Sequence, residues 1–225
     1  MGRKAGLKQI MEVETMKKLF KRGLAMAFCL LCLALGQVQA FDFMADVDEV
    51  SRDPWKAYTL YLRMPWMDYI NNFDKAPGWS SRRNMGTYRY YIKEDSINSS
   101  VKEVVEGAQQ MGQENGMEEY RIKFFTDSVD ITERIFERLV SNCQDSLGEP
   151  CYANTIFNNG TCFKLNVKAW KRKSERGKSD CLIVRSMYGI KNTWWMSGTP
   201  FKSRCLVYIT RLYWPDKNGI PYDNL

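Results

Sequence analysis

An apolar run of thirteen residues near the N-terminus, residues 24–36, decides which part of this chain is left to fold. Four basic residues precede it within 17–22, and Val38-Gln39-Ala40 follows it. A membrane-spanning helix needs about 20 apolar residues, so this run is too short to span. A basic region, a short apolar region and a small-x-small site are the three parts of a secretory signal peptide. We therefore expect cleavage after Ala40 and a secreted or periplasmic protein without a stable membrane span.

The same interpretation sets aside Cys29 and Cys32, whose C-x-x-C spacing is otherwise typical of redox or metal sites. Neither cysteine follows a small residue, as a lipid-anchoring site would require. Met16 begins a more typical signal sequence, so residues 1–15 are either real protein or lie upstream of the true start. The folding part is then 41–225, expected as a single α+β domain or as two halves that meet near 116–150.

Cleavage changes the charge of the chain more than its length. Of the 33 basic and 26 acidic residues, 26 and 24 lie after Ala40, which leaves a net charge of +2. This near-neutral balance argues against nucleic acid as the partner. The remaining charge is uneven: residues 41–150 carry −7, and residues 151–225 carry +9. Such asymmetry indicates an acidic face and a basic face, or two halves that attract each other, or simply a dipolar domain. The favoured partner is an anionic protein or an envelope component.

The hydrophobic pattern predicts helices in the first half of the chain and an antiparallel meander in the second. Helices are expected from Pro65, from the capping box Ser100–Glu103 and from the capping box Asp130–Glu133. Strands are expected at 57–64, 87–94, 118–125, 152–157, 161–170, 181–188 and 204–214. The opening acidic residues 41–53 are expected to form a loose arm. The predicted fold class is α+β, with early short helices packed on a late antiparallel β-meander and linked by disulfides.

Two local patterns in residues 152–170 predict a hairpin and a strand with one apolar and one polar face. Asn159-Gly160 is a strong hairpin signal between two strand-like segments. In the second segment Phe163, Leu165, Val167 and Ala169 share one face, and Lys164, Asn166 and Lys168 share the other. The sequons at Asn98 and Asn159 matter only in a host that glycosylates them.

Five cysteines follow Ala40, and in an exported chain cysteines are first read as disulfides. Cys143 and Cys151 flank a tight turn, while Cys162 and Cys205 lie at the same end of their predicted strands. These considerations predict the disulfides Cys143–Cys151 and Cys162–Cys205, with Cys181 left unpaired.

The chain contains no histidine, which removes Ser-His-Asp, Cys-His and H-E-x-x-H chemistry. No G-x-G-x-x-G or P-loop string occurs either, so no cofactor is predicted. Without histidine, and without C-x-x-C spacing after Ala40, no metal is predicted. Glycosidase chemistry needs only two carboxylates and stays open, with Asp68, Asp74, Glu94 and Asp95 as candidates. A carboxylate pair has no sequence signature, so we expect a protein that is not an enzyme.

Two segments are candidate binding surfaces. The first is the basic segment, which consists of Lys168, Trp170, Lys171, Arg172, Lys173, Arg176 and Lys178. It could hold an anionic partner, or it could be a charged hairpin tip that prevents strand edges from pairing. The second is the pair Trp194 and Trp195, where one ring could be exposed for a sugar or a protein, or both could pack under a loop.

The order of short helices followed by a disulfide-linked meander resembles small exported inhibitor and adaptor domains, such as β-lactamase-inhibitor-like folds. This likeness is one of layout alone and favours binding over catalysis. The sequence therefore predicts an exported, soluble binding protein without catalysis. The alternatives are an envelope carbohydrate binder that uses an exposed tryptophan and a carboxylate glycosidase.

Overall fold

The computed structural model describes residues 41–85, 88–109, 116–173, 178–191 and 203–215. The chain divides into two compact units, residues 1–40 and 41–225, and all described residues lie in the second. None of the helices described in these ranges has both the length and the apolar character that a bilayer span requires.

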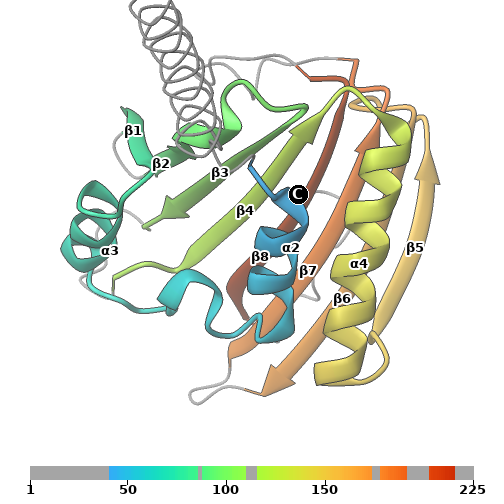
Figure 1. Cartoon of the computed structure of the whole chain (residues 1–225). Coiled ribbons are helices and arrows are strands. Elements are labelled where there is room, and N and C mark those ends of the chain that lie inside the picture. The colour runs from blue at the N-terminus through green and yellow to red at the C-terminus, as the bar shows by residue number, and fades with distance from the viewer. Residues whose placement is uncertain (1–40, 86–87, 110–115, 174–177, 192–202, 216–225) are drawn as a thin grey trace, which may run out of the picture. The chain divides into compact units, whose positions relative to one another are not determined.

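An eight-stranded antiparallel sheet dominates the described residues, in the order β1-β2-β3-β4-β8-β7-β6-β5 (Figure 1). Its strands are β1 (Trp79–Met85), β2 (Tyr88–Lys93), β3 (Val101–Ala108), β4 (Glu119–Thr126), β5 (Tyr152–Phe157), β6 (Lys164–Lys173), β7 (Lys178–Tyr188) and β8 (Cys205–Pro215). The predicted architecture of early helices on a late meander is therefore wrong, because four of the eight strands come from the first half.

Each half of the described chain contributes one four-stranded meander. Strands β1–β4 follow the helices α2 (Phe43–Arg52) and α3 (Trp66–Asp74), and strands β5–β8 follow the helix α4 (Val129–Leu147). The last strands of the two meanders pair along their length, from Glu119↔Leu212 to Thr126↔Cys205. The first strands, β1 and β5, consequently lie at the two edges of the sheet.

The helix predicted from Ser100 is strand β3 in the structure. Val101 and Val105 lie in the cluster beneath the helices, and Val104 lies in a second cluster. The helix prediction failed because Val101, Val104, Val105 and Ala108 fit helical spacing and Ser100 with Glu103 fits a capping box, whereas these residues form a strand with apolar side chains on both faces. Gly107 confirms the close packing here, because a Cβ at this position would lie 2.6 Å from the Tyr69 ring.

Three other segments had a predicted secondary structure that can be compared with the observed one. Helix α4 forms where it was predicted, although its N-cap is Ser128, whose hydroxyl accepts from the Ile131 N–H.

The segment expected to be a loose arm is instead helix α2, capped by Asp42. The strand expected at 57–64 is absent there, and a short 3₁₀ helix, η1 (Ala57–Thr59), with left-handed residues at Tyr58, Thr59 and Arg63 takes its place. A second 3₁₀ helix, η2 (Glu94–Ser96), follows β2.

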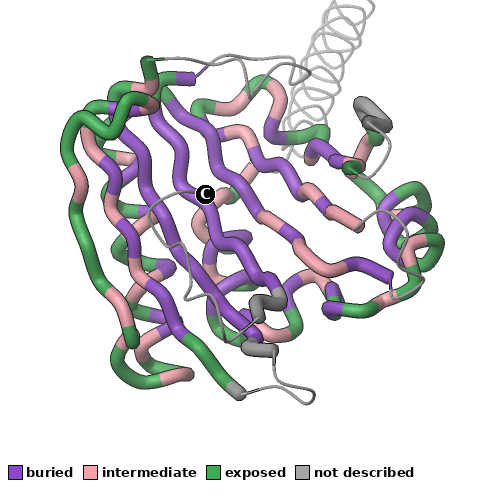
Figure 2. Tube along the Cα trace, turned by 180° about the vertical axis from the view of Figure 1, so that it is seen from behind, coloured by how far each residue is buried: buried purple, intermediate pink, exposed green. Residues whose placement is uncertain are grey.

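The sheet carries apolar side chains on both faces, and many of its residues are buried (Figure 2). One cluster joins α2, α3 and α4 to the sheet through residues such as Tyr69, Ile135 and Val207. A second cluster, which includes Leu165, Ile183 and Leu206, uses the alternate positions of the strands. By strand alternation this second cluster lies on the face opposite the helices.

The predicted disulfides are wrong: none of the five cysteines in the described residues forms one. Cys162 lies just before β6 and Cys205 is the first residue of β8, and β7 lies between these two strands, whose spacing is about 10 Å. A disulfide needs a Cα separation below about 7 Å. Cys143 is buried on α4 beneath the helices, whereas Cys151 is exposed after the turn, so these two side chains lie in different environments.

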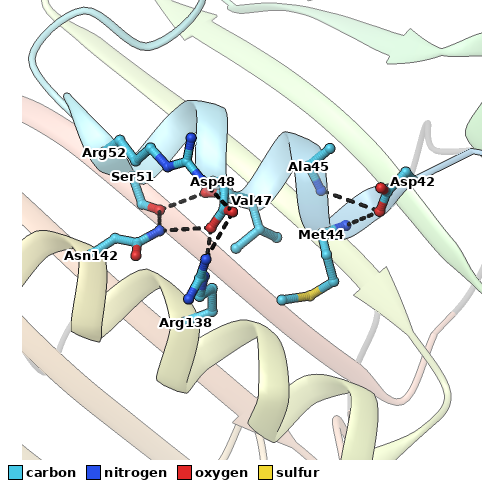
Figure 3. Close-up of polar contacts among 9 residues, drawn as sticks. All are labelled: Asp42, Met44, Ala45, Val47, Asp48, Ser51, Arg52, Arg138 and Asn142. Atoms are coloured by element: carbon cyan, nitrogen blue, oxygen red, sulfur yellow. Dashed lines mark hydrogen bonds and ion pairs between the residues drawn. The ribbon is translucent and has the colours of Figure 1, made fainter.

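Helices α2 and α4 are held together by Asp48 of α2 (Figure 3). Its carboxylate accepts from Arg138 at 2.6 and 3.0 Å and from the Asn142 amide at 2.9 Å. Asn142 also donates to the Ser51 hydroxyl at 2.8 Å, and Arg52 of the same helix pairs with Asp48 at 2.9 Å. The hydrogen bond from Arg138 is the main reason why the pKa of Asp48 falls to about 2.

Asp48→Asn should lower the free energy of unfolding at pH 6, because it removes the charge that pairs with Arg138. The loss should be only about 1 kcal/mol, because solvent partly screens the carboxylate. The folded pKa lies below the unfolded value of about 3.9, so the stabilisation is present above that value and is lost as the pH falls toward 2. Urea unfolding at several pH values should show the variant and the original converging between pH 5 and 2. Asp68→Asn, at an exposed position, is the control, and a difference that stays constant with pH would contradict the role of Asp48.

Candidate functional site

A cleft of about 570 Å³ lies between α4 and the β5 edge of the sheet. Helix α4 packs most closely on β7 and β8, so β5 and the outer part of β6 extend beyond it (Figure 1). The cleft is lined by Glu133, Phe136 and Glu137 of α4, Ala153, Asn154 and Thr155 of β5, Lys164, Asn166 and Lys168 of β6, and Tyr188 of β7.

The floor of the cleft is a row of hydrogen bonds across three strands. The Thr155 hydroxyl of β5 donates to the Asn166 amide oxygen of β6 at 3.0 Å. The Asn166 amide nitrogen donates in turn to the Ser186 hydroxyl of β7 at 3.0 Å. This row fixes the orientation of Asn166, and Lys164 and Lys168 flank it on the same face of β6.

Opposite charges face one another across the cleft, but they are poorly paired. Lys164 lies 3.9 Å from the Glu133 carboxylate and 5.0 Å from the centre of the Tyr188 ring. Lys168 is half-buried and has no ion pair with any residue that the structure describes. Lys168 lines the cleft with Glu133 and Glu137 but forms no ion pair with either, so its ammonium is available to an anion bound beside it.

The Tyr188 hydroxyl is a second unsatisfied group at the cleft. The residue is only 6 % exposed, and its hydroxyl makes no hydrogen bond of good geometry within the described ranges, although the Ser186 side chain lies close enough to act on it. Burial raises the pKa of this hydroxyl, and the neighbouring Ser186 partly offsets the increase. A buried hydroxyl without a partner costs stability, and a bound ligand could supply the missing hydrogen bond.

The structure distributes the predicted basic segment over two strands and does not gather it into one patch. Lys168 lines the cleft, whereas Trp170 is 3 % exposed and donates from its indole to the Gly148 carbonyl at 2.8 Å. Lys171 is exposed. Lys173 and Lys178 lie at the facing ends of β6 and β7. Arg176 and the pair Trp194 and Trp195 lie outside the described residues.

Arg172 is held by a buried carboxylate. Asp180 accepts from Arg172 at 3.0 Å and from Arg211 at 3.0 and 2.7 Å. Both guanidinium groups also lie over the Trp55 ring, at 4.0 and 4.7 Å from its centre. The charge of Arg172 therefore stabilises the packing of the segment after α2 against β6, β7 and β8.

A smaller pocket of about 390 Å³ lies near α3 and β1. The aromatic residues Tyr58, Phe73 and Trp79 line it, together with the polar residues Glu49, Asp53, Lys56, Thr59 and Asn72. The Trp79 ring makes edge contacts with Tyr58 and Phe73, with ring centres 5.5 and 5.2 Å apart.

Beneath this pocket Tyr58 donates to Glu103, a fully buried residue of β3. Burial, reinforced by the nearby Asp46, raises the pKa of Glu103 well above its usual range. Lys93 pairs with Asp46 at 2.5 Å and lies 3.9 Å from Glu103. This network contains two adjacent carboxylates, Asp46 and Glu103, that the sequence did not single out. Only their burial together reveals them.

The four carboxylates considered for glycosidase chemistry, Asp68, Asp74, Glu94 and Asp95, have different surroundings from Asp46 and Glu103. Asp74 accepts from the Tyr91 hydroxyl at 3.0 Å and pairs with Arg89 at 3.3 Å. Asp68 lies in the first turn of α3, and Glu94 and Asp95 lie in η2. No cluster of three or more metal-ligating side chains occurs within the described ranges.

No family model, curated protein or solved structure matches the chain.

Tyr188→Phe removes the unpartnered hydroxyl and should raise the free energy of unfolding by about 1 kcal/mol. Tyr69→Phe is the matched control, because the Tyr69 hydroxyl donates to the Arg89 carbonyl at 2.9 Å and its loss should cost about 1 kcal/mol. Urea unfolding of the two variants measures both changes. Equal destabilisation by the two substitutions would show that Tyr188 has a partner in solution.

Proposed function

We propose that this chain is an exported binding protein without catalytic activity, and that the cleft between α4, β5 and β6 holds an anionic group of a macromolecule. The observation that carries the proposal is the half-buried Lys168, which has no ion pair among the described residues and lines a cleft with Tyr188. An acidic protein or an acidic envelope polymer offers the matching chemistry.

The arrangement of charge supports this binding mode. An anion between Lys164 and Lys168 would replace the long contact from Lys164 to Glu133, and it could accept from the Tyr188 hydroxyl. Glu133 and Glu137 on the helix would then select ligands whose anion is placed against the sheet, because a carboxylate near the helix would be repelled. Export rests on the signal peptide expected at residues 1–40, with cleavage after Ala40.

Lys168→Glu should weaken binding of a 20-residue poly-L-glutamate at least about tenfold at low ionic strength, because it places a like charge in the cleft. Isothermal titration calorimetry at 20 and 500 mM NaCl measures the effect, and wild-type binding should decrease at high salt. Lys75→Glu is the matched control, since this exposed lysine follows α3 near the opposite edge of the sheet. The same weakening by both variants, or equally tight binding of poly-L-lysine, would contradict the proposal.

A carbohydrate site is a second candidate, favoured by the aromatic pocket around Trp79. Aromatic rings beside amide and carboxylate groups suit the apolar face and the hydroxyls of a sugar. Asn72→Ala, at an exposed position of this pocket, should abolish retention on insoluble glycans such as chitin or peptidoglycan sacculi. Asn98→Ala, at an exposed position that does not line the pocket, should not. Absence of retention by the wild-type chain would eliminate this candidate.

A further inference from the structure

Strand β5 is an edge strand without the usual protection against pairing. It ends the strand order and pairs with β6 in unbroken register from Tyr152↔Ala169 to Phe157↔Lys164. Its sequence, YANTIF, has no charged residue and no proline, and most of its residues are exposed (Figure 2). Natural edge strands are commonly blocked by lysine, proline or a bulge, and β5 has none of these.

The backbone of β5 also has unpaired hydrogen-bonding capacity. The N–H of Thr155 donates to the side-chain oxygen of the preceding residue, Asn154, at 2.9 Å. This is a local contact that an incoming strand can replace. The outer side of β5 has no neighbouring strand among the described residues.

Two exposed aromatic rings lie at the end of this edge. Phe157 is 60 % exposed and Phe163 is 56 % exposed, and their ring centres are 6.4 Å apart. Phe157 is the last residue of β5, so the pair offers an apolar anchor in line with the open edge.

We infer that the partner is an acidic protein whose extended segment adds to β5 as a further strand, with an acidic side chain directed to Lys168 and an apolar residue on Phe157 and Phe163. This inference rests on the proposed function and specifies the partner of the same cleft. Strand addition obtains affinity from backbone hydrogen bonds, and the pockets for alternate side chains give specificity.

The register places the acidic side chain correctly. Ala153 of β5 pairs with Lys168 of β6, and both side chains lie on the face beneath α4. A residue opposite Ala153 on the added strand therefore points to the same face, about 10 Å from β6. The methyl group of Ala153 leaves the space between them open, and the flexible stem of Lys168 can reach a glutamate carboxylate across it.

The charge of the added strand distinguishes an acidic partner from a second copy of the chain. A second β5 would bring only the neutral side chains of residues 152–157 to the edge. It would leave Lys168 without an anion, whereas an acidic strand satisfies both the edge and the lysine.

The test uses an octapeptide of alternating glutamate and valine, titrated into the full chain and followed by isothermal titration calorimetry. Two further peptides carry N-methyl groups on alternate residues. In one peptide the methyl groups block the first edge of the extended backbone, and in the other they block the opposite edge. A strand pairs through one edge, so one methylated peptide should lose at least about thirtyfold in affinity while the other keeps it. Lys168→Ala should weaken the unmethylated peptide about tenfold, and the alternating lysine–valine peptide should not bind.

Equal binding of the two methylated peptides would overturn strand addition while leaving the Lys168 site intact. Failure of the glutamate–valine peptide to bind, where poly-L-glutamate binds, would also overturn it. A dimer that dissociates on Thr155→Pro would assign the edge to a second copy and overturn the acidic partner. The proposed function fails separately, if Lys168→Glu leaves poly-L-glutamate binding unchanged.

Discussion

The pairing of β4 with β8 joins the two halves of the described chain into one sheet. Eight residue pairs link these strands, although they are separated by about 80 residues in the sequence. Apolar residues such as Ile122 and Ile209 face each other at this pairing and lie beneath the helices. Because each meander ends at the centre, the first strand of each is placed at an edge. The free β5 edge is thus a direct consequence of the central pairing.

The cleft exists because the helices cover only part of one face of the sheet. Asp48 binds Arg138 and Asn142, which fixes α2 beside α4. Helix α4 in turn packs on β7, β8 and β4 through Ile135, Leu139 and Cys143. Strand β5 and the polar face of β6 remain outside this packing. A cleft with polar walls therefore forms where the helix layer ends, beside an edge with unpaired backbone groups.

Local sequence patterns predicted β6, whose burial is one-sided, and also β7 and β8, which are buried on both faces. The polar Lys164–Asn166–Lys168 face of β6 and the Asn-Gly hairpin before it were both readable, because alternation and turn chemistry are local. Strand β3 was not, because its valines fit helical spacing and Ser100 with Glu103 fits a capping box. Sequence could not show that Glu133 and Glu137 face the β6 lysines, since only the position of α4 brings them together. The disulfide prediction failed for a similar reason: it required a strand order, and β7 lies between the two strands concerned.

Lys168 and Arg172 show why charge in a sequence does not by itself identify a site. Both are basic residues on the same face of β6, four positions apart. Arg172 lies opposite Asp180 and above Trp55, and these contacts satisfy its guanidinium group within the protein. Lys168 lies between Ala153 and Val184, neither of which can accept a hydrogen bond through its side chain. The neighbouring strands therefore neutralise one cation and leave the other available at the cleft. For this reason the binding proposal rests on Lys168 and not on the whole basic segment.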